Sequence, residues 1–152
     1  MVICSRSIDK LATTKADVES KCPDVEIRVV PIDFSKTLDY SSLFYDKEIA
    51  ENLRLIVNNV GYFKVCKVFE DDPEDLQRQI KVNLYPVTLL SKFGINSFKN
   101  QQVNQGYVNR FGLVSVSSYS AIRHYTTAGV YGGTKRYDKF LGHTIDKNAK
   151  TE

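Results

Sequence analysis

Short apolar runs alternate along the chain with longer segments in which apolar residues recur at helical spacing. The short runs are rich in β-branched residues and predict strands over 1–4, 25–34, 53–57 and 111–116. The longer segments predict helices over 8–21, over 42–52, from 72 past 83, and over 129–145. Strands separated by helices are typical of the α/β class, so we expect a parallel, doubly wound sheet.

Residues at the ends of these segments support two of the helices. Ser7 is a suitable N-cap for the first helix, and a proline follows the end of that helix. Asp72 and Pro73 begin the third helix as N-cap and first-turn proline, and Pro86 inside it is expected to kink it. The Asn- and Gln-rich segment 96–109 is polar and predicts a surface loop.

Composition fits one ordinary globular domain over residues 1–152. The 152 residues are 42% hydrophobic and 26% charged, which suits a single core. A net charge of +3, with no basic run interleaved with aromatic residues, argues against a nucleic-acid partner. No apolar stretch approaches the roughly 18 residues of a membrane span. Three widely spaced cysteines predict buried free thiols, and two distant histidines suggest no metal site.

Three segments are expected to bring polar side chains to one edge of the sheet. Tyr131 and Lys135 lie four residues apart in the last helix, about one turn apart on the same face. Ser118 follows the strand before that helix, and the Asn-Asn-Val-Gly segment 58–61 follows an earlier strand. Because doubly wound sheets bind ligands at the carboxyl ends of their strands, we expect these groups to line one crevice.

Six short motifs, in this order, resemble the short-chain dehydrogenase/reductase family. They are S-R-S at 5–7, V-P-I-D-F at 30–34, N-N-V-G at 58–61, K-V-N at 81–83, V-S-S at 116–118 and Y-G-G-T-K at 131–135. The interval from Ser118 to Tyr131 also matches the family's spacing. The resemblance is greatest to the hydroxysteroid dehydrogenase and very-long-chain 3-oxoacyl-CoA reductase branch. It implies a partial Rossmann-like, doubly wound parallel sheet. Residues 1–152 would then form a single, partial dinucleotide-binding and catalytic domain.

The resemblance implies an oxidoreductase that transfers a hydride between NADP(H) and a small carbonyl or alcohol, such as a steroid or a 3-oxoacyl thioester. At the matching positions, Tyr131 is the general acid, and Lys135 is the cation that favours its ionised form and also holds the nicotinamide ribose. Ser118 orients the substrate oxygen, and Asn83 anchors a water in the proton relay. An isolated tyrosine ionises far above neutral pH, so it needs such a cation.

Four further residues are implied in cofactor binding. Arg6 stands where an arginine accommodates the 2′-phosphate of NADP(H). Asp33 matches the residue beside the adenine, and Asn59 and Gly61 match the turn along the adenosine ribose. Each has a plainer alternative. Arg6 suits a surface charge, Asp33 suits a turn cap, and 58–61 suits a strand-ending turn because Asn and Gly tolerate positive φ.

The chain departs from the family pattern at both ends. Its first glycine is Gly61, so we expect the first strand and the glycine-rich turn that approaches the pyrophosphate to be missing. Nothing after Lys135 contains the proline of the family's next segment. Gly132 and Gly133 are expected to loosen the last helix by about 1 kcal/mol each relative to alanine.

These departures leave two functions open. The chain is either a truncated part of such a reductase, inactive by itself, or a non-catalytic remnant that acts as a scaffold or interaction protein. A missing first strand leaves two sheet edges with unpaired backbone groups, so self-association into a homo-oligomer is expected. The resemblance also implies an intracellular protein, either cytoplasmic or associated with the endoplasmic reticulum.

Overall fold

The computed structural model describes residues 1–105 and 111–149. It divides into two compact units, Met1–Ser42 and Leu43–Glu152. The assignment of residues 1–152 to a single domain stays a prediction.

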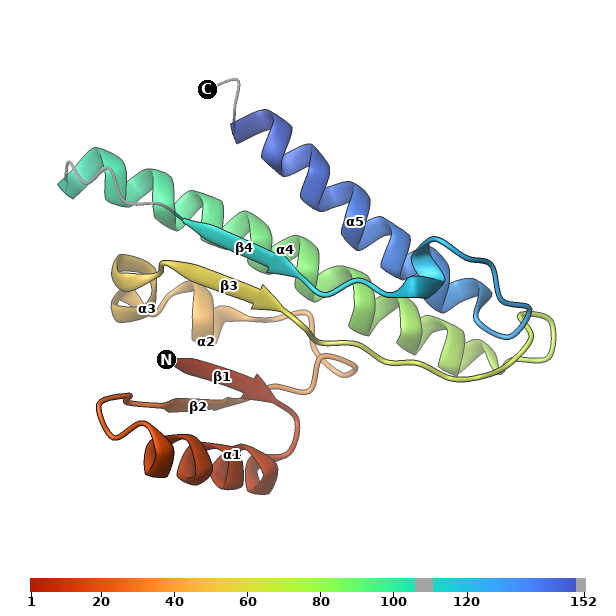
Figure 1. The fold of residues 1–152 in the computed structure, drawn as a ribbon, viewed down its shortest axis with the longest axis horizontal. Coiled ribbons are helices and arrows are strands. Elements are labelled where there is room, and N and C mark those ends of the chain that lie inside the picture. The colour runs from red at the N-terminus through yellow and green to blue at the C-terminus, as the bar shows by residue number, and fades with distance from the viewer. Residues whose placement is uncertain (106–110, 150–152) are drawn as a thin grey trace. The chain divides into compact units, whose positions relative to one another are not determined.

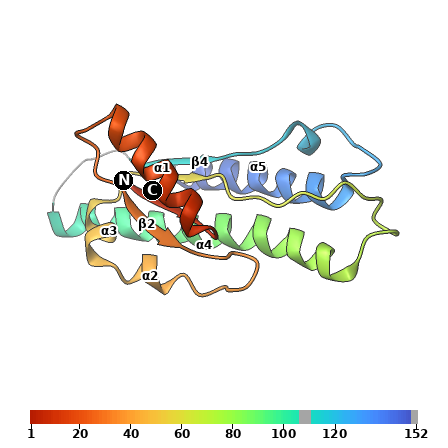
Figure 2. The same cartoon turned by 90° about the horizontal axis from the view of Figure 1, so that it is seen from below.

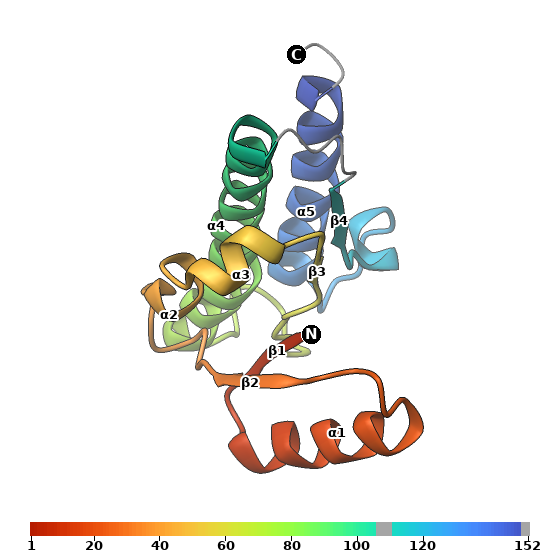
Figure 3. The same ribbon diagram turned by 90° about the vertical axis from the view of Figure 1, so that its left-hand side faces the viewer.

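The first unit is a strand–helix–strand motif. It consists of β1 (Val2–Ser5), α1 (Ile8–Lys21) and β2 (Arg28–Pro31). The two strands are parallel and in register from Val2 opposite Arg28 to Ser5 opposite Pro31. Figure 3 shows α1 along one face of this pair. The side-chain oxygen of Ser7 accepts a hydrogen bond from Lys10 N, so the predicted N-cap is confirmed.

The second unit is built on two long helices and a second parallel strand pair. The short helix α2 (Ser41–Phe44) crosses the boundary between the units. The elements that follow it are α3 (Lys47–Asn52), β3 (Leu55–Asn58), α4 (Pro73–Gln105), β4 (Gly112–Ser115), the 3-10 helix η1 (Tyr119–Ala121) and α5 (Gly129–Ala149). Strands β3 and β4 run side by side along α4 and α5 (Figure 1). Figure 2 shows the segment after β3 running to the end of the helices where α4 begins.

The β3–β4 pair packs one of its faces on α4. Asn58 Nδ2 donates to Ser91 Oγ of α4 at 3.1 Å, and Ile56 lies against Gly94 of the same helix. The alternate residues Leu55 and Val57 are each 55% exposed. Since successive strand residues point to opposite faces, this alternation is what a half-covered strand pair requires.

The observed elements confirm an α/β fold with parallel, partial sheets and correct two predicted elements. The expected helix 42–52 is two short helices, because Asp46 caps α3 through a bond from Ile49 N to its carboxylate. The expected loop 96–109 is wrong for residues 96–105, which belong to α4, and residues 106–109 lie outside the described part of the chain. Buried Gln101 donates to the carbonyl of Ala50 at 2.7 Å, so tertiary hydrogen bonds stabilise the helix through this polar stretch.

The three thiols are free, as predicted, but not all buried. Cys22 is exposed, while Cys4 and Cys66 are half-buried. Loss of solvent around Cys4 raises its pKa to about 11. Among the described residues, no helix is both long and apolar enough to cross a membrane.

Candidate active site

The first turns of α5 hold the predicted Tyr131 and Lys135 in different surroundings. Tyr131 is half-buried, and its ring packs on Phe63 with the ring centroids 4.5 Å apart. No described residue forms a hydrogen bond with the Tyr131 hydroxyl in this structure. Lys135 is only 4% exposed. The helix therefore carries a tyrosine hydroxyl without a hydrogen-bond partner among the described residues, one turn before a buried ammonium.

The Lys135 ammonium is held by two acceptors. Its Nζ donates to the carbonyl of Val116, just past the end of β4, at 2.9 Å. It also donates at 2.9 Å to Oδ2 of Asp138, a residue one turn further along α5 that is 3% exposed. Burial raises the pKa of Asp138, and the hydrogen bond and charge of Lys135 oppose that rise.

The side-chain amide of Asn83, on α4 of the second unit, forms three hydrogen bonds. Its Oδ1 accepts from Tyr62 N at 2.7 Å, and its Nδ2 donates to Tyr62 O and to Thr134 Oγ1, both at 3.0 Å. Thr134 directly precedes Lys135. Asn83 therefore ties the segment after β3 to α5, which is a positioning role, while its predicted role in anchoring a water stays a prediction.

Ser118 caps the short helix η1. Its Oγ accepts from Ser120 N at 3.3 Å and from Ser120 Oγ at 2.9 Å, which leaves its own hydroxyl hydrogen for another acceptor. A Cβ placed on Gly132 would lie 2.7 Å from Ser120 O. The turn that holds Ser118 therefore packs directly on the first turn of α5, next to Tyr131.

The two asparagines of the N-N-V-G segment have different surroundings. Asn58 is buried against α4, as its bond to Ser91 shows, whereas Asn59 is exposed. A Cβ on Gly61 would lie 3.7 Å from both Lys135 Nζ and Asn83 Oδ1. The bare backbone of Gly61 therefore borders the buried ammonium.

In the first unit, Arg6 and Asp33 follow the carboxyl ends of β1 and β2, which are paired in parallel. Arg6 is exposed and lies just before the N-cap of α1. Asp33 Oδ1 accepts from Ser35 N at 3.0 Å and Ser35 Oγ at 2.6 Å. These bonds, and to a lesser extent the charges of Lys36 and Arg6, lower the pKa of Asp33. Asp33 therefore caps a turn, the alternative that the sequence left open, and keeps Oδ2 for a further partner.

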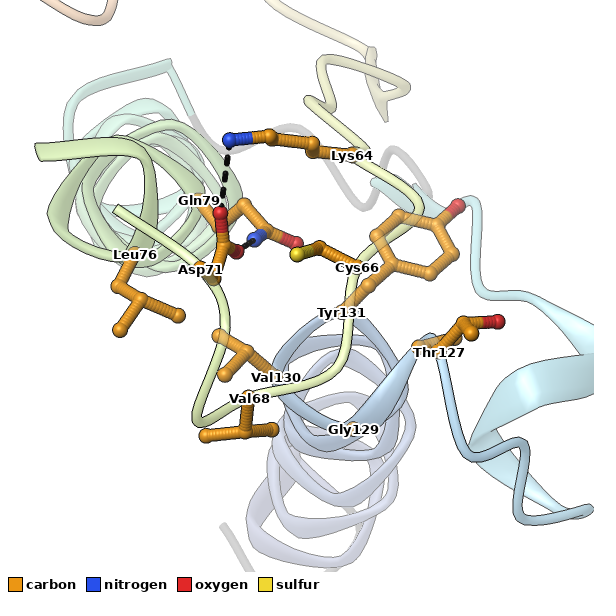
Figure 4. Close-up of a pocket in the computed structure, with 11 residues that line it drawn as sticks. Lys64, Cys66, Val68, Asp71, Leu76, Gln79, Thr127, Gly129, Val130 and Tyr131 are labelled. Carbon is orange, nitrogen blue, oxygen red and sulfur yellow. Dashed lines mark hydrogen bonds and ion pairs between the residues drawn. The ribbon is translucent and has the colours of Figure 1, made fainter. Parts of the chain in front are cut away.

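A small crevice borders Tyr131 but is not this site. Figure 4 shows Lys64, Asp71 and Gln79 in contact with one another along one side, through an ion pair of 2.9 Å and a hydrogen bond of 3.2 Å. The Tyr131 ring projects on the side away from Val68. Because the polar groups of this crevice satisfy each other, it has little left to offer a ligand.

Sequence reasoning missed two contributors to the site. Thr134 bonds Asn83 across 51 residues, which no local pattern reveals. Asp138 lies three residues after Lys135 in a predicted helix, and such i, i+3 pairs of opposite charge are neighbours on a helix surface. That spacing was a usable signal for Asp138.

Comparison with known proteins identifies the family. The sequence model described as short chain dehydrogenase matches residues 1–150. The chain therefore belongs to the short-chain dehydrogenase family, as the six motifs predicted.

Curated relatives come from the predicted branch. The chain is 28% identical over 157 residues to putative steroid dehydrogenase 4 of Caenorhabditis elegans, which covers 99% of this chain and 56% of the relative. It is 30% identical over 152 residues to the very-long-chain 3-oxoacyl-CoA reductase let-767 of Caenorhabditis briggsae, with coverage of 95% and 45%. The chain thus spans about half the length of the curated relatives it matches.

Solved structures of the family share the fold. A bulky-bulky ketone specific alcohol dehydrogenase from Comamonas testosteroni matches 99% of this chain and 57% of its own, with a TM-score of 0.81 and 15% identity. An alcohol dehydrogenase from Thermococcus sibiricus, complexed with 5-hydroxy-NADP, matches 97% and 59%, with a TM-score of 0.78 and 21% identity. Both place the chain in the Rossmann-like fold of this family.

The family uses nicotinamide cofactors, and the second unit has features that fit one. An ammonium has three N–H donors, and two of those on Lys135 are taken by Val116 and Asp138. The third has no partner among the described residues. The space beside it, at Gly61, is one that a Cβ would occupy. An oxygen-rich ligand such as a ribose suits this combination of free donor and bare backbone.

Proposed function

We propose that the chain forms the catalytic part of an NADP(H)-dependent short-chain dehydrogenase that interconverts a carbonyl and an alcohol, with Tyr131 as the proton donor. The observation with the greatest weight is the arrangement on α5. The uncommitted Tyr131 hydroxyl lies one turn from the buried Lys135 ammonium, and the Ser118 turn packs on the same helix end.

In the proposed reaction the cofactor and the chain supply different groups to the carbonyl. The cofactor supplies the hydride when it is bound. The Tyr131 hydroxyl gives its proton to the carbonyl oxygen, and the hydroxyl hydrogen of Ser118 bonds and orients that same oxygen. The Lys135 ammonium stabilises the phenolate that remains on Tyr131. Asn83 holds the backbone at Tyr62 in place beside α5.

The choice of NADP(H) rests on the first unit. Arg6 is an exposed cation next to the N-terminus of α1, and both a guanidinium and a helix N-terminus attract phosphate. We assign Arg6 to the 2′-phosphate and Asp33 Oδ2 to the adenine, and Asn59 and Gly61 to the adenosine ribose.

The substrate class follows from the relatives. Those with curated names are putative steroid dehydrogenases and very-long-chain 3-oxoacyl-CoA reductases, so we propose a steroid ketone or a long-chain 3-oxoacyl thioester. Location in the cytoplasm or at the endoplasmic reticulum stays a prediction. The comparisons do not favour the alternative of a non-catalytic scaffold.

Replacing Tyr131 with phenylalanine tests the proposal. The change keeps the ring on Phe63 but removes the transferable proton, so turnover should fall by about 10²–10⁴. The assay follows NADPH oxidation in a polypeptide that contains this chain and reduces a test ketone. Tyr125→Phe, at an exposed tyrosine, is the matched control and should retain wild-type turnover. Normal turnover in Tyr131→Phe would exclude Tyr131 as the acid.

A further inference from the structure

Lys135 and Asp138 form an ion pair in the second unit that is buried on both sides. Both side chains are about one-twentieth exposed, and their polar atoms are 2.9 Å apart. Among the described residues, Lys135 is the one charged group that acts on Asp138. The pair therefore has no surrounding charge network to stabilise it.

Packing does not account for a carboxylate at this position. Asp138 Oδ1 is buried and has no hydrogen-bond partner among the described residues. Burying a carboxylate oxygen without a partner is unfavourable, and an apolar residue of similar volume is often neutral or more stabilising than a buried ion pair. Since packing does not explain the carboxylate, we look to its effect on the position of Lys135, the residue it contacts.

The two acceptors of Lys135 come from different elements and converge on one atom. Asp138 reaches Nζ from α5, and the Val116 carbonyl reaches it from the end of β4. With two N–H groups directed at these acceptors, the direction of the third is determined. A lysine side chain has four rotatable bonds, so without such restraint its ammonium samples many positions.

We propose that Asp138 is a positioning residue that holds the Lys135 ammonium beside Gly61 with its third N–H presented to a ligand hydroxyl, such as that of a ribose. This inference rests on the proposed role of Lys135 in cofactor binding. It assigns to Asp138 a function that the six family motifs do not include.

The test observes Lys135 directly and uses the chain as it is. In protein labelled with ¹⁵N-lysine, the Lys135 ammonium should give a slowly exchanging NMR signal, which Lys135→Met identifies by its loss. Asp138→Asn keeps the shape and removes the charge. The hydrogens of the Lys135 ammonium should then exchange with water at least tenfold faster, and the signal should broaden. Asp138→Glu should restore it. Asp146→Asn, the same change at an exposed site on α5, should leave it unchanged.

A second arm measures NADPH affinity for the same variants, each made in a polypeptide that contains this chain. Asp138→Asn should weaken binding about tenfold, while Asp146→Asn should not. A Lys135 signal that persists in Asp138→Asn overturns the positioning role. A lost signal with unchanged NADPH affinity also overturns it, because the pair is then only structural. Absence of NADPH binding in wild type, with the Lys135 signal dependent on Asp138, contradicts the proposed function and leaves the positioning of the ammonium established.

The wild-type chain provides the same test if Asp138→Asn does not fold. Lowering the pH protonates Asp138, whose pKa is raised by burial, and so removes the charge without a substitution. The ¹⁵N shift of Lys135 and the ¹³C shift of the Asp138 carboxyl should then change with the same midpoint. A Lys135 shift that does not follow the carboxyl overturns the proposal.

Discussion

The two parallel strand pairs, one in each unit, present their polar residues in opposite ways. After β1 and β2, Arg6 is exposed, and Asp33 bonds Ser35 only two residues away. In the unit that contains β3 and β4, two buried asparagines are instead bonded over long distances along the chain: Asn58 bonds Ser91 across 33 residues, and Asn83 bonds Thr134 across 51. Substitution of the exposed Arg6 should therefore change ligand affinity without changing stability, whereas substitution of the buried groups of the second unit should change stability as well.

The largest expected effect is in the second unit, at Lys135. Lys135→Met leaves the Asp138 carboxylate buried without its partner, so the free energy of unfolding at neutral pH should fall by about 3–5 kcal/mol. Because the pKa of Asp138 is raised in the fold, the contribution of this carboxyl group to stability is greatest below the ordinary aspartate pKa and falls as pH rises through the raised value. The loss should therefore shrink in acid.

Denaturant unfolding across the acid range measures this effect. Lys139→Met, at an exposed lysine on the next turn of α5, is the control and should change stability little. Equal stability of Lys135→Met and wild type at neutral pH would contradict the buried pair.

The next effect is in the first unit and concerns affinity. Arg6→Ala removes a charge-assisted contact to phosphate worth about 1.5–3 kcal/mol, so NADPH should bind one to two decades more weakly. NADH affinity and the melting temperature should be unchanged, because Arg6 is exposed. Isothermal titration of both cofactors into a polypeptide that contains this chain measures the difference, and Lys10→Ala on α1 is the control. An equal loss for NADH would show that Arg6 does not recognise the 2′-phosphate.

Adjacent glycines on α5 offer a matched pair of changes in the second unit. A Cβ on Gly132 would lie 2.7 Å from Ser120 O, so Gly132→Ala should destabilise by about 1–3 kcal/mol through overpacking. Gly133 has nothing within 4 Å of such a Cβ, so Gly133→Ala should stabilise by about 0.5–1 kcal/mol through helix propensity. Thermal unfolding of both variants checks this, and shifts of the same sign would contradict the contact.

The smallest expected effect tests the half-buried thiol of the first unit. Burial raises the pKa of Cys4 to about 11, so its contribution to stability is present below pH 9 and is lost as pH rises toward 11. Cys4→Ala should remove this part of the alkaline loss. Cys22→Ala, at an exposed thiol, should keep it. Identical alkaline profiles for the two variants would show that Cys4 ionises freely in the folded chain.

Sequence reasoning succeeded where the determining contacts are local. The helix at Ile8–Lys21 has its predicted bounds, because Ser7 and the following proline act within a turn of its ends. The start of α4 at Pro73 follows from the same local chemistry. Residues 96–105 were predicted wrongly as a loop, because buried Gln101 donates to the carbonyls of Ala50 and Leu53, which the local sequence does not reveal.

The candidate site divides along the same line. The spacing of Ser118, Tyr131 and Lys135 is a property of the sequence, since one helix turn and one strand end place them. Together with the other motifs of the set, it predicted the family. Only the tertiary structure showed that Gly132 permits close contact with Ser120. It also showed that the Lys135 ammonium donates to both the Asp138 carboxylate and the Val116 carbonyl. Helix spacing brings residues to one face, but what that face meets depends on packing between segments distant in the chain.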